Sequence, residues 1–288
     1  MIHEVLLSIQ GVSKTFGSGS ASYIAVKDVD LSVARGEVVS IIGHSGCGKS
    51  TLLGMISGLM SPTAGTLRLN GQLIKGPGPD RGMVFQHHAL LPWLSIYDNV
   101  YVAVDAAFKQ ERKAEKAARV ERALRSVELW SHKHKKPHQI SGGMKQRTAV
   151  LRAFVLEPQV LLLDEPFGAL DALTKATLHD ELLRLWSADS GTKTIILVTH
   201  DIDEAIFLSD RVVVMTNGPE ATISETVPIR VSRPRDKRAM LYSAEYAQIK
   251  DHLLHRLILA EQPQFRVQPE ESLYSHDGRV VMYPYLQV

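Results

Sequence analysis

The sequence predicts an α/β fold with a mostly parallel sheet, an antiparallel β edge and an inserted helical subdomain. Three observations predict it. A glycine-rich loop, residues 43–51, joins an apolar strand to a helix; apolar runs alternate with helical segments after that loop; and the segments before it alternate apolar and polar residues. Because parallel sheets bind ligands at the carboxyl ends of their strands, we expect the functional residues there.

Length and composition limit the class of protein. The 288 residues suffice for one large domain, or for a core with a smaller appended part. The 33 basic and 31 acidic residues nearly cancel, so no overall field favours nucleic acid, and the single cysteine excludes an internal disulfide. The N-terminal residues lack a secretory pattern, and no window approaches the roughly 18 apolar residues of a membrane span. We therefore expect a cytoplasmic protein that reaches a membrane only through a protein partner.

Residues 5–9 and 25–33 alternate like strands exposed on one side, and a glycine- and serine-rich segment, residues 17–22, joins them. Phe16 stands just before that segment. Its ring could stack on an adenine or could close the edge of the sheet, and the local sequence leaves both interpretations open.

The loop at residues 43–51 follows the apolar run 38–42 and opens a helix, which is the context of a phosphate-binding loop. Its glycines let consecutive N–H groups point inward and form, with the helix N-terminus, an anion site. Lys49 can reach the outer phosphates, and the Ser50 hydroxyl can ligate the accompanying Mg²⁺. The predicted ligand is a nucleoside triphosphate, held by Gly43, His44, Ser45, Gly46, Cys47, Gly48, Lys49, Ser50 and Thr51.

A second apolar strand, residues 82–85, ends at Gln86. Residues 87 to about 158 are rich in helix formers, above all from 106 to 127, and predict a helical insertion between two strands. Three histidines and three lysines lie within residues 131–138. Since the lysines would repel a cation, we interpret this segment as a solvated basic loop and not as a metal site.

Ser141, Gly142 and Gly143 precede a helix and offer bare backbone N–H groups. They form either a second anion site or a simple N-cap, and the local sequence does not decide between these. The apolar run 160–163 predicts a strand buried on both faces, and it ends in Asp164 and Glu165. Consecutive strand residues point to opposite faces. Asp164 therefore suits the Mg²⁺ shell, and Glu165 suits orienting or deprotonating a water molecule.

The remaining chain continues the alternation. A helix near residues 174–186 follows Asp171, the strand 194–199 ends at His200, and a helix and the strand 211–215 come next. His200 could donate to a terminal phosphate or could simply pack. Residues 235–261 predict a helix whose apolar stripe needs a partner surface; the stripe is Leu253, Leu254, Leu257 and Ile258. We expect a domain over residues 1–230 and a helical extension and tail over 231–288.

The order of these motifs closely resembles the ATP-binding subunits of ABC transporters over roughly residues 5–230. The resemblance implies a RecA-like P-loop NTPase core. It identifies residues 43–51 as the Walker A loop, Gln86 as the Q-loop, Ser141 to Met144 as the signature motif, residues 160–165 as Walker B, Ala169 to Asp171 as the D-loop, His200 as the H-switch and Phe16 as the adenine-stacking aromatic.

The resemblance also implies activity and partners. It implies an ATPase that binds ATP and Mg²⁺, with Gln86 beside the metal and Asp171 near the nucleotide. In this family the phosphate loop of one subunit faces the signature motif of another, so a second ATPase subunit, identical or a close paralogue, is expected. Permease subunits, and indirectly a solute-binding protein, are the further partners. The expected location is the cytoplasmic face of the membrane.

The signature motif departs from the usual pattern, because Met144 stands where the family has glutamine. The segments 76–86, 90–93 and 141–147 look like those of nitrate, sulfonate, taurine, bicarbonate or cyanate importers. The alternative functions are an ABC-type ATPase acting on nucleic acid or ribosomes, and a nucleotide-dependent regulatory module. The first usually shows fused cassettes or a coiled-coil insertion, which this sequence lacks, and Glu165 with His200 argues against the second.

Overall fold

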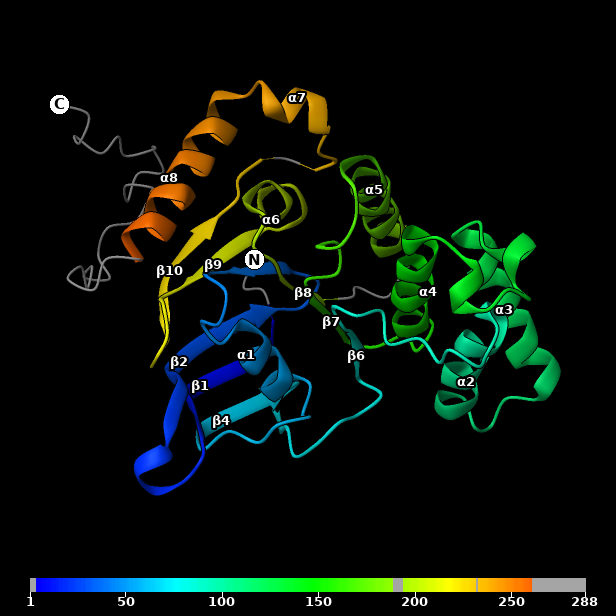
Figure 1. The fold of residues 1–288 in the computed structure, drawn as a ribbon, viewed down its shortest axis with the longest axis horizontal. Coiled ribbons are helices and arrows are strands. Elements are labelled where there is room, and N and C mark those ends of the chain that lie inside the picture. The colour runs from blue at the N-terminus through cyan, green and yellow to red at the C-terminus, as the bar shows by residue number, and fades with distance from the viewer. Residues whose placement is uncertain (1–3, 189–193, 232, 261–288) are drawn as a thin grey trace.

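The computed structural model describes residues 4–188, 194–231 and 233–260, and it contains two sheets (Figure 1). The larger sheet has six strands in the order β10-β9-β3-β8-β7-β6, and all neighbours except β10 and β9 are parallel. Its strands are β3 (Val38–Ile42), β6 (Arg81–Val84), β7 (Val160–Asp164), β8 (Thr194–Val198), β9 (Arg211–Met215) and β10 (Ile223–Pro228). The predicted mostly parallel α/β fold is confirmed.

Alternate residues of the central strands enter two different cores. Ile42 and Leu197 face a core shared with α4 (Gly142–Phe154), α5 (Ala172–Ala188) and α6 (Ile202–Leu208). The intervening residues, such as Ile41 and Ile196, face a core shared with α1 (Lys49–Ile56). Because both faces are covered, β3 and β8 are buried along their whole length, as their continuous apolar runs predict.

Most antiparallel strands form a second sheet of their own, and β10 is the antiparallel edge of the larger sheet. The second sheet has the order β2-β1-β4-β5, and it packs over the α1 side (Figure 1). The strands are β1 (Val5–Phe16), β2 (Tyr23–Ala34), β4 (Ala64–Leu69) and β5 (Gln72–Leu73). β1 and β2 are longer than residues 5–9 and 25–33, so Phe16 ends a strand and pairs with Tyr23.

Three helices stand between β6 and β7, on the right of Figure 1. They are α2 (Ile96–Ala107), α3 (Lys113–Ser126) and α4, and they share a separate core that includes Val100, Val120 and Leu124. The helix-forming run 106–127 is divided before α3, where the Arg112 backbone N–H donates to Glu115 Oε2 at 2.8 Å. A capping box of this kind fixes where a helix begins.

The C-terminal extension holds α7 (Lys237–Leu241) and α8 (Ala244–Ala260) instead of one helix. The Tyr246 backbone N–H donates to Ser243 Oγ at 3.1 Å and so starts α8. The buried face of α8 is Tyr246, Ile249 and Leu253, which pack on the core that contains α6. The predicted stripe is wrong in part, since Leu254 and Ile258 are exposed.

Arg235 fastens this extension to the end of α6. Its guanidinium is nearly buried and donates to the carbonyl oxygens of Ile206, Phe207 and Ser209 at 2.7–3.0 Å. Burial lowers the pKa of Arg235 to about 10. The last carbonyls of a helix have no partner within the helix, so Arg235 satisfies groups that would otherwise be buried and unpaired.

Replacing this guanidinium should weaken the attachment of the extension. We expect Arg235→Met to lower the Tm by roughly 5 °C, because three carbonyl groups lose a charged donor. Arg238→Met, an exposed change on α7, is the control and should leave the Tm unchanged. Equal Tm values for wild type and Arg235→Met in a thermal melt would contradict the assigned role.

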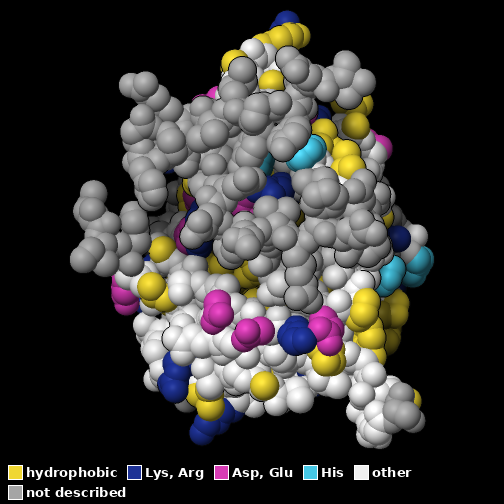
Figure 2. Space-filling model, turned by 90° about the vertical axis from the view of Figure 1, so that its left-hand side faces the viewer, with side chains coloured by type: hydrophobic (Ala, Val, Ile, Leu, Met, Phe, Trp, Pro, Cys, Tyr) yellow, Lys and Arg dark blue, Asp and Glu magenta, His cyan; other side chains and the backbone are white. Residues whose placement is uncertain are grey.

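Two further observations concern the outside of the molecule. No helix in the described ranges is long and apolar enough to cross a membrane. Figure 2 shows the side on the left of Figure 1, where acidic and basic side chains stand next to one another along the lower part of the visible surface. That mixture agrees with the small net charge of +2.

Candidate functional site

The glycine-rich loop lies between β3 and α1, and its backbone leaves no room for side chains at two positions. Gly48 has φ +96°, and a Cβ there would lie 2.7 Å from Val26 Cγ2. A Cβ on Gly43 would lie 2.7 Å from Cys47 Sγ. The Cys47 thiol is fully buried, and that burial raises its pKa. The cysteine therefore packs beneath the loop as an uncharged group.

Lys49 places a buried cation at the centre of the loop. Its Nζ donates to the carbonyl oxygens of Gly43 and His44, both at 2.8 Å, and the residue is only 5% exposed. Carbonyl dipoles alone do not neutralise an ammonium group. With the free N–H groups at the start of α1, the loop presents net positive charge to an anion.

Asp164 ends β7 beside the first turn of α1. Its Oδ1 accepts a hydrogen bond from Ser50 Oγ at 3.0 Å. Burial raises the pKa of Asp164, while the hydrogen bond from Ser50 works in the opposite direction. A half-buried carboxylate next to a hydroxyl is a set of hard oxygen donors, the kind that Mg²⁺ prefers. The residues present therefore fit a magnesium ion.

Side chains that follow three strands, β6, β7 and β8, meet at Glu165. Its Oε2 accepts a hydrogen bond from Gln86 Nε2 at 3.2 Å and lies 3.3 Å from His200 Nδ1. Glu165 also has φ +43°, in the left-handed region that costs a residue with a side chain about 1–2 kcal/mol. The backbone hydrogen bond from Glu165 N to Val198 O, 2.9 Å, holds this conformation at the sheet edge.

Ser141, Gly142 and Gly143 form a second group at the start of α4. Ser141 Oγ accepts from Met144 N at 3.3 Å, so the N-cap is present. Asp171 caps α5 in the same way, through Thr174 N at 3.0 Å and Thr174 Oγ1 at 2.6 Å. Those hydrogen bonds lower the pKa of Asp171.

The two caps lie next to each other. A Cβ on Gly143 would lie 2.8 Å from Thr174 Cγ2, and one on Gly142 would lie 3.6 Å from Leu170 Cδ2. In the described residues no hydrogen bond or ion pair joins this second group to Lys49, Asp164 or Glu165. One chain therefore carries two helix N-termini that begin at glycine-containing segments, one at Lys49 and one at Ser141.

Met144, next to the second group, is partly buried. Its side chain packs, together with Ile140, against the core of the helical subdomain that contains Val100 and Leu124. A glutamine at this position would put an amide against that apolar core. Methionine therefore provides an apolar side chain for this core where the family has an amide, and the backbone N–H groups of Gly142 and Gly143 are retained.

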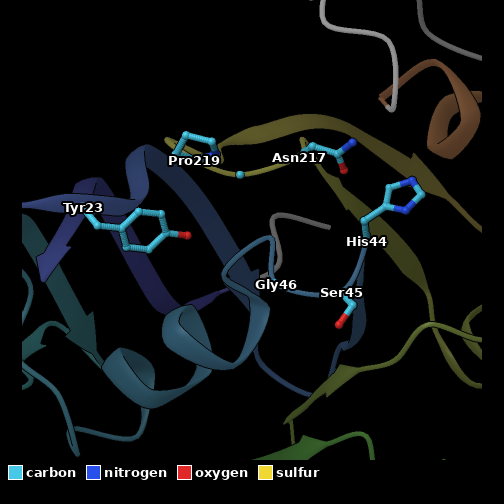
Figure 3. A pocket seen from close by; sticks show the side chains of 7 residues that line it. Tyr23, His44, Ser45, Gly46, Asn217 and Pro219 are labelled. Carbon is cyan, nitrogen blue, oxygen red and sulfur yellow. The ribbon is translucent and has the colours of Figure 1, made fainter.

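A pocket of about 450 Å³ opens beside the phosphate loop (Figure 3). Tyr23 and Pro219 stand on one side of it, and His44 and Asn217 lie near each other on the other. Phe16, the predicted adenine-stacking residue, does not line this pocket; it is 40% exposed, and Lys14 Nζ lies 5.2 Å from the centre of its ring.

One contact of the loop had no signal in the sequence. His44 Nε2 lies 2.9 Å from the carbonyl oxygen of Leu257, near the end of α8. The C-terminal extension therefore reaches the phosphate loop itself.

Comparisons with known proteins agree with this geometry. The family model described as "ABC transporter" matches residues 26–168. The chain is 50% identical over 248 residues to the bicarbonate transport ATP-binding protein CmpD of Synechocystis sp., covering 86% of this chain and 87% of that protein. The chain belongs to the ABC transporter family.

Two further relatives from the ABC transporter family are comparably similar. The chain is 51% identical to the nitrate import ATP-binding protein NrtD of Synechococcus elongatus, over 88% of this chain and 92% of that protein. It is 47% identical to the nitrate transport protein NasD of Klebsiella oxytoca, over 88% and 96%.

Solved structures of ABC cassettes share the fold. The dimeric ATP-binding cassette MJ0796, in a post-hydrolysis state bound to ADP and Pi, matches with a TM-score of 0.69 and 32% identity, over 79% of this chain and 100% of that one. The structure of cbiO1 from Clostridium perfringens matches with a TM-score of 0.69 and 26% identity, over 90% and 100%. As a member of this family, the chain is a nucleotide-binding ATPase subunit.

Proposed function

We propose that the chain is the ATP-hydrolysing subunit of a membrane importer for a small anion of the nitrate or bicarbonate kind. The observation that carries this is the pair of anion-binding elements, one around Lys49 and one at Ser141, separated within a single chain. The relatives at 47–51% identity act in nitrate and bicarbonate transport. Their identities are too close to favour one anion.

The residues around Lys49 have different roles in ATP hydrolysis. Lys49 and the loop N–H groups bind the outer phosphates of ATP. Phe16 lies outside the pocket but pairs with Tyr23, which lines it, so the Phe16 ring would stack on an adenine at the rim. Ser50, Asp164 and Gln86 would hold Mg²⁺, which neutralises phosphate charge when it is bound. Glu165 accepts a proton from the attacking water, and His200 contacts the terminal phosphate.

The hydrogen bonds at Glu165 support these roles. Gln86 and His200 both direct a nitrogen at Oε2, so one carboxylate oxygen is held in place. The other oxygen, Oε1, remains for the water molecule. A base must lie within hydrogen-bond reach of the proton it takes, and the contacts from the neighbouring strand ends fix the position of this carboxylate.

The second element serves the nucleotide of a second ATPase subunit. Ser141, Gly142 and Gly143 would bind the terminal phosphate held by the partner's loop, with Asp171 beside the same interface. Loss of that phosphate removes the bridge, so the pair can open. The helices between β6 and β7 would pass this motion to permease subunits, which place the chain on the cytoplasmic face of the membrane.

Uptake by the cells that make this protein tests the proposal. Deleting its gene should abolish uptake of one labelled anion, and Lys49→Ala should fail to restore it because the buried ammonium is lost. Separate assays with nitrate, bicarbonate, cyanate and taurine identify the substrate, and the wild-type gene is the control. Unchanged uptake of all four anions in the deletion strain would contradict an importer of this kind.

A further inference from the structure

Lys175 joins two helices that flank the site. It lies in the first turn of α5, where its backbone N–H donates to the carbonyl oxygen of Asp171 at 2.9 Å. Its Nζ donates to Asp201 Oδ2 at 2.8 Å and lies 3.7 Å from Glu204 Oε2. The helix that follows Asp171 is thereby tied to the residue that follows His200.

Asp201 uses both carboxylate oxygens to hold its place. Oδ1 accepts from the Glu204 backbone N–H at 3.1 Å and caps α6, while Oδ2 takes the bond from Lys175. The Asp201 backbone N–H donates to Thr199 Oγ1 at 3.1 Å. His200 stands between Thr199 and Asp201, so the position of this carboxylate sets the backbone of His200.

The positive charge of Lys175 lies beside two carboxylates, those of Asp201 and Glu204. Glu204 is 2% exposed at its side chain, and its Oε2 lies 3.2 Å from His179 Nε2. The other ring nitrogen, Nδ1, faces Lys237 Nζ at 3.1 Å. Lys175 lies 2.8 Å from Asp201 and 3.7 Å from Glu204, so its charge faces both carboxylates.

The ionisation of this pair agrees with the geometry. Burial opposes the charge of Lys175 most strongly, but the hydrogen bond to Asp201 and the charges of Asp201 and Glu204 together outweigh it and raise the pKa of the ammonium. Burial likewise opposes the charge of Asp201, and the hydrogen bonds from Lys175 and from the Glu204 backbone N–H, together with the charge of Lys175, still lower its pKa. Removing the lysine would leave two carboxylates near each other with less compensation, which is costly in a half-buried place.

We propose that Lys175 is a positioning residue that transmits the placement of the Asp171 segment, through the carboxylate of Asp201, to His200. The inference rests on the proposed function, in which Asp171 faces a second subunit and His200 contacts the terminal phosphate. When the partner fixes the Asp171 segment, the first turn of α5 is fixed with it. Lys175 and Asp201 then hold His200 in its place beside Glu165.

Steady-state ATPase kinetics of the purified full-length chain test this. Lys175→Met removes the charge and keeps the aliphatic length, and we expect kcat to fall on the order of 10- to 100-fold while KM for ATP changes by less than about twofold. Lys175→Arg keeps the charge and should stay within about threefold of wild type. Lys250→Met is the matched control, since Lys250 pairs at 2.8 Å with Asp203 of α6 and makes no ion pair with Asp201 in the described residues.

Three results would overturn the inference: equal kcat in Lys175→Met and Lys250→Met, a loss confined to KM, or no rescue by arginine. Asp201→Asn provides a second route, because asparagine still caps α6 while the negative charge is lost. It should reproduce the fall in kcat at constant KM, and adding it to Lys175→Met should cost nothing more. Losses that multiply in the double variant would contradict the link, and if Lys175→Met does not fold, Asp201→Asn decides alone.

Glu165→Gln in the same assay separates this inference from the proposed function. If the wild-type chain hydrolyses ATP and Glu165→Gln does not, the site stands, and the lysine variants report on positioning alone. A wild-type chain without ATPase activity, or a Glu165→Gln variant with normal turnover, would overturn the proposed function and this inference with it.

Discussion

Glu165→Gln is expected to slow ATP hydrolysis by about 10²- to 10⁴-fold while ATP binding stays intact. Glutamine has nearly the shape of glutamate, so Gln86 and His200 keep a neighbour at the same place. An amide, however, cannot accept the proton that water must lose. The bound ATP would then persist between two chains, and the variant should elute as a dimer from a sizing column run with ATP and Mg²⁺.

Glu157→Gln is the matched control for this change. Glu157 also has a left-handed backbone, φ +52°, and its exposed carboxylate pairs with Arg119 away from the strand ends. The Glu157→Gln variant should hydrolyse ATP at the wild-type rate and show no trapped dimer. Normal turnover by Glu165→Gln would mean that Glu165 does not accept the proton from water.

The phosphate loop and the strand ends could be predicted because their signals are local. Gly43, Gly48 and Lys49 stand within seven positions of the sequence, and the buried strand before them is a continuous apolar run. Asp164 and His200 each follow such a run. Parallel pairing then brings these strand ends to one edge, as β3, β7 and β8 show.

Two features of the C-terminal part were not predicted, the strand β10 and the start of α8, and each has a physical reason. β10 is an edge strand that contains Glu225 and ends at Pro228, and edge strands carry charges and proline that hide the strand pattern. The start of α8 did have a signal, since Ser243 is a good N-cap. Helix propensity on both sides of Ser243 outweighed it in the prediction of one helix.

The links between elements could not be predicted at all. The pair of Lys175 with Asp201 spans 26 residues, and the contact of His44 with Leu257 spans 213. No local pattern encodes such partners, because they depend on how α5, α6 and α8 pack. These links connect α5 to the residue after His200 and the C-terminal extension to the loop at residues 43–51, and only the structure reveals them.

Ser141→Arg is expected to stop turnover, with a loss of at least about 100-fold, and to leave ATP binding by the monomer unchanged. Ser141 caps α4 beside Gly142 and Gly143, and no hydrogen bond or ion pair in the described part of the chain connects it to Lys49. The arginine would therefore obstruct a phosphate held by the other subunit. Titration of a fluorescent ATP analogue at low protein concentration measures the monomer's affinity.

Mixing two inactive variants gives the sharper form of this test. Lys49→Ala disables the first element and Ser141→Arg the second, so a mixed dimer holds one complete site, formed by the intact loop of one chain and the intact Ser141 of the other. If the two sites act independently, an equal mixture should regain about a quarter of wild-type activity, since half of its dimers are mixed and each has one site of two. Loss of ATP binding by monomeric Ser141→Arg would instead mean that both elements serve one nucleotide within a single chain, and the two-chain site would have to be abandoned.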